Sequence, residues 1–532
     1  MKIALAQINA TVGDITGNVA NIVTAVTKAK QAGAHIMLTP ELVLCGYSPE
    51  DLLFRDDFQR KIEWAVDEIS HFSHGITLII GHPQREGKRL YNAATVLRDG
   101  QVLAVYYKNS LANYTVFDER RYFTPGEQPC VFEQDGIRFG VNICADVWQS
   151  QAPSRAVSAG AQVLLVLNAS PYHLDKQHER YDVVRDRINE NHIPVLYCNL
   201  VGGQDELVFD GGSFAMNNAG QVVNQFPLFE AGVHVVEFDG LQPLPAPYAP
   251  TLSPEATVWR ALMLGLTDYV NKNRFPGVLL GLSGGIDSAL TLALAVDALG
   301  AQRVHAVMMP SEFTADMSIH DARIMAAGLG VEYTELAIMP VFAEFQHTLA
   351  EVFAQCENDV TEENLQARIR GTLLMALSNK FGKLVVTTGN KSEMAVGYAT
   401  LYGDMAGGFA LLRDVPKTLV YRLSVYRNNL SPVIPQRVID RPPTAELRAD
   451  QTDQDSLPAY AVLDDIVECY VERDMSVECM INKGLNAQDV QRVVRMIDRS
   501  EYKRRQAPPG VRITPRGFGK DRRYPITQGF VP

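Results

Sequence analysis

Short apolar runs alternate with longer amphipathic segments along most of the chain. Residues 18–32 place Val19, Ile22, Val23 and Val26 on one face at helical spacing, which predicts a helix after the first apolar run. The strands predicted in the first 240 residues are 2–8, 35–38, 76–80, 92–97, 102–107, 137–143, 163–167 and 195–199. Glycine turns between several of these runs predict hairpins, so a mixed, layered α/β domain is expected.

A proline-rich stretch separates this region from the rest. Residues 239–255 hold five prolines and little that could pack, which predicts a semi-rigid linker. Strands predicted beyond it, at 278–280, 304–308, 331–336 and 384–388, alternate with helices as in a doubly wound parallel sheet. The end of the chain is predicted to be helical. We therefore expect domains at residues 1–243 and 256–532, joined by a linker at 244–255.

Composition narrows the class of protein. The chain has 532 residues, 46% hydrophobic and 21% charged, and a net charge of −12. The acidic balance argues against general nucleic-acid binding, and no apolar run is long enough to predict a membrane span. Seven cysteines without C-x-x-C pairs fit a reducing compartment better than a disulfide framework or a zinc site. A cytoplasmic protein without a prosthetic group is expected.

The stretch 278–290, VLLGLSGGIDSAL, predicts a buried strand, a glycine turn and a helix start. Free N–H groups at such a helix start form an anion site, and the glycines clear space for a phosphate. Asp287 would repel a bare phosphate, which suggests a bridging Mg²⁺. The spacing is not that of the common G-x-x-x-x-G-K-[ST] loop. It resembles the pyrophosphate loop of enzymes that split ATP between its α and β phosphates.

Three polar side chains in the first domain follow predicted strands. Glu41 lies in TPEL, Lys108 in YYK and Cys144 in VNICAD. Taken singly, each has an ordinary structural interpretation: a helix cap, a surface charge and a buried core thiol. Strand ends are where a layered α/β domain places its active site, so we expect the three to meet.

Together these residues resemble the Glu–Lys–Cys triad of the nitrilase superfamily, as do FDERRYF at 117–123 and NASP at 168–171. The resemblance implies an α-β-β-α layered domain that hydrolyses amides. It also implies that Glu119 is an auxiliary acid and that the glutamine contacts are Tyr114, Ser170 and Lys176. The LPNYGVFDE stretch of glutamine-dependent NAD synthetases reads LANYTVFDE here, with Ala112 and Thr115 as departures.

The second half is similar to the same synthetases in four further stretches, in order: NLQARIR at 364–370, TTGNKSE at 387–393, YGDMAGG at 402–408 and DVPKT at 414–418. The resemblance implies a domain of the adenine nucleotide alpha hydrolase type. The implied ATP contacts are Gly281, Leu282, Ser283, Gly284, Gly285, Ile286, Asp287, Ser288, Thr388 and Lys417. The implied deamido-NAD⁺ contacts are Asn364, Arg368, Glu393 and Lys503, and the implied Mg²⁺ ligands are Asp287 and Glu393.

The tail at 501–523 carries eight basic and two acidic residues. Either a solvated tail or a contact with polyphosphate explains this surplus, whereas sparse aromatic residues argue against nucleic acid.

The expected reaction is ATP-dependent amidation of deamido-NAD⁺ with ammonia from L-glutamine. Because ammonia is mostly protonated in water, a protected passage between the two active sites is expected. A homo-oligomer is also expected, because an interface would close such a passage and the family resemblance implies one. Two alternatives remain: another amidotransferase of the same two-part construction, or an ammonium-using synthetase with an idle nitrilase half.

Overall fold

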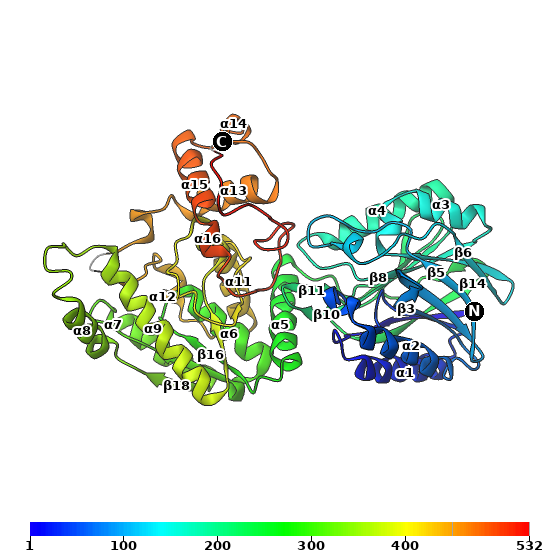
Figure 1. Ribbon diagram of the computed structural model, residues 1–532, viewed down its shortest axis with the longest axis horizontal. Helices are drawn as coiled ribbons and strands as arrows, with labels where there is room; N and C mark the ends of the chain where they lie inside the picture. Colours follow the sequence, from blue (N-terminus) through cyan, green and yellow to red (C-terminus); the bar gives the residue numbers. More distant parts are fainter. Residues whose placement is uncertain (449–450, 531–532) are drawn as a thin grey trace. The chain divides into compact units, whose positions relative to one another are not determined.

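A computed structural model describes residues 1–448 and 451–530. Its internal contacts divide the chain into two compact units, Met1–Leu252 and Ser253–Pro532 (Figure 1). Each unit has hydrophobic cores of its own.

Two sheets form the centre of the first unit. The strand order of one is β15 (Gln242–Pro243), β14 (Gly232–Asp239), β1 (Lys2–Gln7), β2 (Ile36–Leu38), β3 (Thr77–Glu86), β4 (Arg89–Arg98), β5 (Gln101–Tyr107). The order of the other is β13 (Val222–Gln225), β12 (Phe214–Met216), β9 (Val195–Asn199), β8 (Val163–Asn168), β7 (Ile137–Ile143), β6 (Cys130–Gln134). A separate hairpin pairs β10 (Val201–Gln204) with β11 (Leu207–Asp210).

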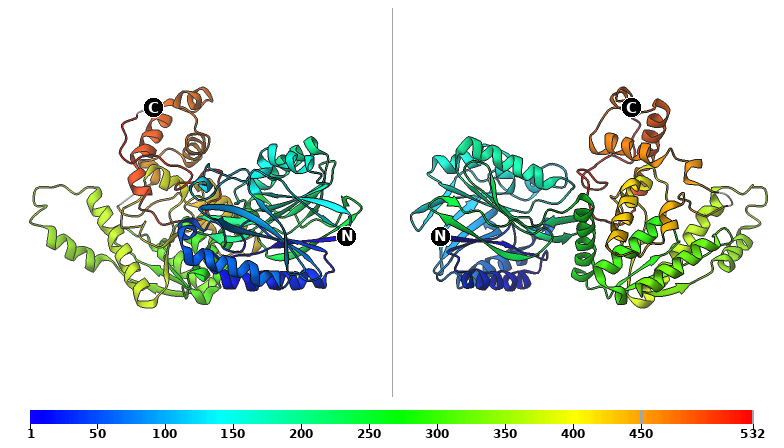
Figure 2. Two further views of the ribbon diagram at one scale, coloured as in Figure 1. Left: turned by 45° about the vertical axis from the view of Figure 1, so that its right-hand side comes forward. Right: turned by 180° about the vertical axis from the view of Figure 1, so that it is seen from behind.

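Successive side chains of a strand point to opposite faces of the sheet, which explains how these two sheets are layered. In β1, Ile3 and Leu5 pack against the second sheet, whereas Ala4 and Ala6 face the core that contains the outer helices. The outer helices are α1 (Ile15–Gln31) and α2 (Asp56–Ser70) on the first sheet and α3 (Gln151–Ser158) and α4 (Lys176–Asn191) on the second. Figure 2 shows the blue and the cyan helices on opposite outer sides of the strands. The predicted α-β-β-α fold is confirmed.

The first helix begins earlier than the sequence pattern predicts. It starts at Ile15, because the side chain of Asp14 accepts a hydrogen bond from Gly17 N and caps the first turn. The apolar periodicity locates the buried face of the helix, while the capping residue determines where the helix starts.

The proline-rich segment is better packed than its composition suggests. Ala246 N donates to Val223 O and Ala249 N donates to Gln225 O, both at 3.0 Å, so part of the segment lies along β13. Proline can occupy an edge strand where its missing N–H would face away from the ladder. Pro245 and Pro247 flank Ala246, and the two N–H groups that donate belong to Ala246 and Ala249, which are not prolines.

The second unit contains a parallel sheet. Its strand order is β18 (Glu332–Glu335), β17 (Val304–Met308), β16 (Val278–Gly281), β19 (Leu384–Thr387), β20 (Phe409–Ala410). The chain runs outward from β16 in one direction and then returns to place β19 on the other side of it. In open α/β sheets, a crevice forms where the strand order reverses in this way, at the carboxyl ends of the strands.

Helices cover both faces of this sheet. The helices before and around the sheet are α5 (Pro254–Lys272), α6 (Ile286–Leu299), α7 (Asp316–Leu329), α8 (Met339–Leu349), α9 (Val360–Phe381), α11 (Lys417–Leu430) and α12 (Gln436–Asp440). Leu279 and Val385 pack with Phe342 of α8 and Ile369 of α9. Helix α6 contacts β16 and β17 and packs with α5 and α11. The predicted doubly wound architecture is confirmed.

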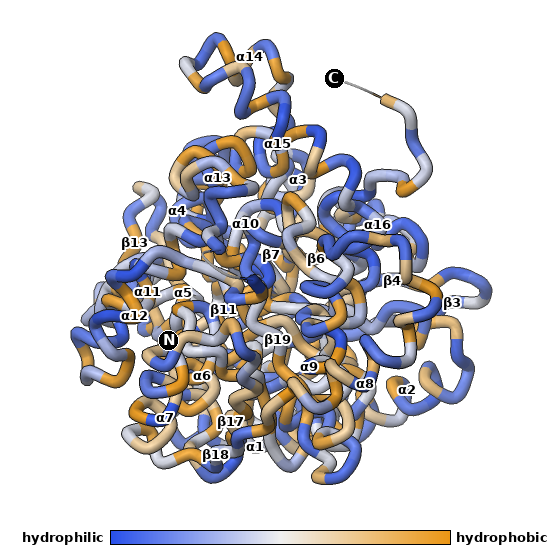
Figure 3. The backbone as a smooth tube through the Cα atoms, turned by 90° about the vertical axis from the view of Figure 1, so that its left-hand side faces the viewer, coloured by the Kyte–Doolittle hydropathy of each residue, from blue (hydrophilic) through white to orange (hydrophobic). Residues whose placement is uncertain are grey.

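A helical layer completes the second unit. It consists of α10 (Lys391–Val396), α13 (Tyr460–Val467), α14 (Val477–Asn482), α15 (Ala487–Arg499) and α16 (Glu501–Arg504). Ala395 and Val396 of α10 join the apolar core of this layer, so the layer is attached to a helix beside the strand ends. Figure 3 shows hydrophobic and hydrophilic colours together along α14, as expected for a helix with one buried face. Among the described residues, no helix has the length and hydropathy to cross a membrane.

We predict that His82 makes the first unit sensitive to acid. This buried ring contacts Pro83 O at 3.0 Å and Thr95 Oγ1 at 2.7 Å, and burial lowers its pKa from 6.5 to about 4. The unfolded chain therefore binds the proton more tightly, so stability is lost as pH falls below 6.5. Between pH 7 and 5 the loss from this group is about 2 kcal/mol.

Urea unfolding of the wild type and of His82→Gln at both pH values would measure this contribution. The variant should lose less stability than the wild type over the same interval. Equal losses in the two proteins would contradict the assignment.

Candidate active sites

The three predicted catalytic residues of the first unit follow three different strands. Glu41 comes after β2, Lys108 after β5 and Cys144 after β7. Cys144 has a φ of +42°, in the left-handed region that non-glycine residues rarely adopt. Strained positions of this kind cluster at active sites, where they aim a side chain.

A charge cluster joins two of these residues to the predicted auxiliary acid. Lys108 Nζ donates to Glu41 Oε1 at 2.6 Å and to Glu119 Oε1 at 2.8 Å, and all three side chains are at most 4% exposed. Burial alone would lower the pKa of Lys108, but Glu119 and Glu41 outweigh it and raise the pKa well above the ordinary value. The lysine is therefore an ammonium ion held between two acids.

Other donors complete the shells of the two acids. Ala169 N donates to Glu41 Oε2 at 3.0 Å and Ala112 N donates to Glu119 Oε2 at 2.8 Å. Asn92 Nδ2 donates to Glu41 Oε1 at 2.7 Å and reaches Glu119 Oε1 at 3.4 Å. Ala112 is one of the two departures from the family's sequence and stands where the family has proline, so this chain has an N–H donor to Glu119 that a proline could not supply.

The thiol of Cys144 belongs to this cluster. Burial and the nearby charge of Glu41 raise its pKa well above the usual range, against opposing effects of Lys108 and of Ala169 N–H. A thiol with a raised pKa is protonated at neutral pH, so it needs a base before it can attack. Glu41 is the acid whose charge acts most strongly on it.

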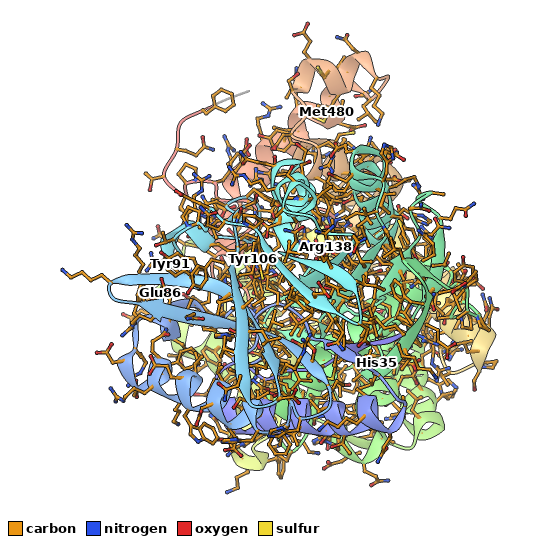
Figure 4. All side chains as sticks on the ribbon, turned by 90° about the vertical axis from the view of Figure 1, so that its right-hand side faces the viewer. His35, Glu86, Tyr91, Tyr106, Arg138 and Met480 are labelled. Atoms are coloured by element: carbon orange, nitrogen blue, oxygen red, sulfur yellow. The ribbon has the colours of Figure 1, made fainter. Side chains whose placement is uncertain are left out.

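Asp146 is a residue that the sequence analysis did not single out. Its buried carboxylate accepts from Ile143 N at 2.9 Å, Tyr106 Oη at 2.8 Å, Asn109 N at 3.1 Å and Ser110 N at 2.7 Å. Tyr106 is labelled in Figure 4. Burial raises the pKa of Asp146 to about 6. This carboxylate ties the segment before the nucleophile to the segment after the lysine.

The predicted glutamine contacts lie in different settings. Tyr114 is 51% exposed and interacts electrostatically with Cys144. Ser170 is buried directly after the residue whose N–H contacts Glu41, and Lys176 Nζ lies 2.8 Å from Glu179 at the start of α4. Their role in binding glutamine stays a prediction.

The glycine loop of the second unit has the predicted strand–turn–helix form. Strand β16 ends at Gly281 and α6 begins at Ile286. Ser288 Oγ accepts from Ser283 N at 3.2 Å and donates to Gly285 O at 3.0 Å, so the loop is preformed. The N–H groups at the start of α6 lie at the carboxyl end of the sheet, where an anion site is expected.

A cavity of about 280 Å³ opens beside this loop. The predicted ATP contacts that line it are Gly281, Leu282, Ser283, Gly285, Ile286, Asp287, Ser288, Thr388 and Lys417, and Glu393 lines it too. Apolar side chains line another part of the wall: Val307, Met308, Met309, Leu374, Val385 and Val386. Phosphate-binding backbone beside an apolar wall suits a nucleotide.

One lysine joins the two predicted metal ligands. Lys417 Nζ lies 2.5 Å from Asp287 Oδ2 and 3.4 Å from Glu393 Oε1, and Asn390 Nδ2 donates to Asp287 Oδ1 at 2.9 Å. Burial, with the charge of Asp287 and despite Lys417, raises the pKa of Glu393 to about 8. No cluster of three or more His, Cys, Asp or Glu side chains suited to a metal occurs in residues 1–448 and 451–530. Two carboxylates fit Mg²⁺, which takes its remaining ligands from substrate phosphates and water.

The other predicted deamido-NAD⁺ contacts converge on segment 397–401. Asn364 Oδ1 accepts from a hydroxyl of this segment at 2.7 Å, and Arg368 Nε donates to one of its carbonyls at 3.3 Å. Lys503 Nζ donates to two of its carbonyls, both at 2.7 Å. None of the three is among the described residues that line the cavity, although part of segment 397–401 is. Their contact with substrate stays a prediction.

Further charged residues at the cavity were missed by the sequence analysis. Arg370 Nε donates to Met309 O at 3.0 Å, and burial lowers the pKa of Arg370 to about 10. Ser318 Oγ accepts from Arg441 at 3.0 Å and donates to Glu446 at 2.6 Å. Arg441 and Glu446 begin and end the stretch RPPTAE. This stretch is proline-rich and polar, which predicts a loop but does not indicate that the loop lies at the cavity.

Comparisons with known proteins match both units to families. The carbon–nitrogen hydrolase family matches residues 2–243, and the NAD synthase family matches residues 258–507.

Curated relatives are similar over the entire chain. Glutamine-dependent NAD(+) synthetase of Acinetobacter baylyi is 48% identical over 100% of this chain and 99% of the relative. The Thermotoga maritima enzyme of that name is 45% identical over 100% and 99%. The solved glutamine-dependent NAD+ synthetase of Acinetobacter baumannii, in complex with ADP, is 45% identical with a TM-score of 0.81, covering 99% of this chain and 98% of its own. This chain therefore belongs to the glutamine-dependent NAD⁺ synthetases.

Proposed function

We propose that the protein amidates deamido-NAD⁺ to NAD⁺, consuming ATP, L-glutamine and water and releasing AMP, pyrophosphate and glutamate. It is a carbon–nitrogen ligase with glutamine as amide donor. The observation that carries the glutaminase half is the ammonium of Lys108 between Glu41 and Glu119, in the cluster that also contains the thiol of Cys144.

Glutamine hydrolysis begins with proton transfer. Glu41 takes the thiol proton of Cys144, and Sγ attacks the amide carbon of glutamine. Oε2 of Glu41 is the oxygen suited to this, because Ala169 N–H contacts Oε2 and also stabilises the thiolate, whereas Oε1 accepts from Lys108. Lys108 and backbone N–H groups offset the negative charge that develops on the carbonyl oxygen.

Collapse of the tetrahedral intermediate breaks the carbon–nitrogen bond. Glu41 returns its proton to the departing ammonia, leaving a γ-glutamyl thioester on Cys144. Glu41 then takes a proton from water, whose oxygen attacks the thioester carbon. Glutamate leaves, and Cys144 regains its proton. The auxiliary role of Glu119 is to keep Lys108 charged and in place.

In the second unit, the carboxylate of deamido-NAD⁺ attacks the α-phosphorus of ATP and pyrophosphate departs. Residues 281–288, all of which line the cavity except Gly284, are proposed to hold ATP together with Thr388 and Lys417. Asp287 and Glu393 would hold Mg²⁺, which, when bound, neutralises phosphate charge. Ammonia then displaces AMP from the acyl-adenylate. The residues proposed to contact the dinucleotide are Asn364, Arg368, Glu393 and Lys503.

The proposal places this reaction in the cytoplasm. Its basis is the sequence's seven cysteines, an odd number without C-x-x-C pairs, which suits a reducing compartment.

Replacing Cys144 with Ala separates the two half-reactions. Glutamine-supported NAD⁺ synthesis should fall by at least about 1,000-fold because the nucleophile is gone, while ammonium-supported synthesis stays within about twofold. Steady-state rates with each nitrogen donor measure both effects. Unchanged glutamine-supported synthesis would rule out the proposed thioester.

Replacing Gly284 with Ala should impair the ATP site. Gly284 has a φ of +80°, and a Cβ there would lie 2.4 Å from Ser318 O, so the loop must shift. We expect both glutamine- and ammonium-supported synthesis to fall by at least about tenfold, with weaker binding of ATP by calorimetry.

Gly300→Ala is the matched control. Gly300 has a φ of +82° and no atom within 4 Å of the added Cβ, so alanine there tests a positive φ without the clash. Equal effects of the two substitutions would show that strain alone, and not the anion loop, explains the loss.

The proposal includes a homo-oligomer, as the family resemblance implies. Apolar side chains exposed at residues 341–360 support it: Val341, Phe345, Val352, Phe353 and Val360. A second copy covering them would remove apolar area from water. Sedimentation equilibrium should give a multiple of the 58.8 kDa chain mass, and a monomer at micromolar concentration would contradict this part.

A further inference from the structure

Asn92 of β4 contacts each charged residue of the glutaminase cluster. Its carbonyl oxygen accepts from Lys108 N at 2.9 Å. Its side-chain Nδ2 donates to Glu41 Oε1 at 2.7 Å and approaches Glu119 Oε1 at 3.4 Å. The main chain of Asn92 therefore contacts the lysine backbone and its side chain contacts both carboxylates, and Asn92 is 1% exposed.

The orientation of this amide comes at a cost in hydrogen bonding. With Nδ2 directed at the carboxylates, Oδ1 of Asn92 is buried without a partner among the described residues. An unsatisfied buried acceptor costs about 1–3 kcal/mol, and such exceptions call for an explanation. The explanation here is the charge of the neighbours, because a carboxylate gains more from an N–H donor than a neutral carbonyl does.

We propose that Asn92 is a positioning residue for glutamine hydrolysis, which holds Oε1 of Glu41 so that Oε2 serves as the base for Cys144. This inference rests on the glutaminase function proposed above. Oε1 of Glu41 then receives hydrogen bonds from Lys108 and Asn92, whereas Oε2 receives one from Ala169 N. The less saturated oxygen is the one that can accept a proton.

The amide also suits the charge of its surroundings. A lysine at this position would compete with Lys108, and an ionised acid would add a third carboxylate to two that already share one ammonium. A neutral donor stabilises the carboxylates without changing the net charge of the cluster.

The test begins with Asn92→Leu, which keeps the branching of the side chain at Cγ and removes the donor. Glutamine-supported kcat should fall roughly 10- to 100-fold, as expected for loss of a hydrogen bond to a charged group, with KM for glutamine changed much less. Ammonium-supported synthesis should stay within about twofold of wild type, because the second unit is untouched.

Asn92→Asp adds a readout that packing alone would not change. The introduced carboxyl can donate one hydrogen bond when protonated, but when ionised it repels the neighbouring acids. The ratio of glutamine-supported rates, Asn92→Asp over Asn92→Leu, should therefore fall as pH rises from 6 to 9. The two variants have the same titratable groups except at residue 92. The pH dependence of the ratio therefore reports the ionisation of the carboxyl at residue 92.

Asn18→Leu is the matched control. The buried side chain of Asn18 contacts only backbone groups, donating to Thr11 O and Leu44 O and accepting from Thr11 N. We expect it to lower thermal stability without the selective loss of glutamine-supported kcat.

Three outcomes would overturn the inference: normal glutamine-supported kcat in Asn92→Leu, a pH-independent ratio of the two variants, or an equal selective loss in Asn18→Leu. The Cys144→Ala rates identify a different failure. If Cys144→Ala retains glutamine-supported synthesis, the glutaminase function itself is wrong. If that variant behaves as proposed and the Asn92 variants do not, only the role of Asn92 fails.

Discussion

The glutaminase site depends on one ammonium shared by two buried carboxylates. Lys108, Glu41 and Glu119 come from separate segments, and the two acids could not be buried side by side in ionised form without a cation between them. The strand ends that carry Glu41 and Lys108 are thus brought together by electrostatics as well as by packing. Removing Lys108 would leave two buried carboxylates without a cation between them.

The synthetase site uses a similar arrangement in a different setting. Lys417 lies between Asp287 and Glu393, and Asn390 donates to Asp287 much as Asn92 donates to Glu41. Here the acids line a cavity, and a cation that arrives with substrate would favour the ionised form of Glu393, whose pKa burial raises to about 8. In the first unit both acids are enclosed, and one of them, Glu41, is the base that we propose.

The sequence predicted most of the fold and the motif residues, because apolar periodicity and glycine turns report on local structure. It did not reveal Asn92 or Asp146, since a polar residue at a strand position or after a nucleophile gives no local sign of its partners. Those partners lie far away in the chain, as Asn92 and Glu41 do. For Lys503, a motif match predicts contact with the dinucleotide, and no signal in the sequence indicated that backbone carbonyls of segment 397–401 accept from its ammonium.

Charge conservation makes the raised pKa of the Cys144 thiol compatible with the nucleophile role that we propose for it. With both acids ionised, the cluster of thiol, two carboxylates and one ammonium has a net charge of −1 before reaction. Transfer of the proton from Cys144 to Glu41 leaves that net charge unchanged. The transfer therefore needs no new counter-ion, only redistribution of charge around Lys108. The pKa of the Cys144 thiol is raised relative to a thiol in water. The thiol can nevertheless transfer its proton easily to a base that is buried in the same environment.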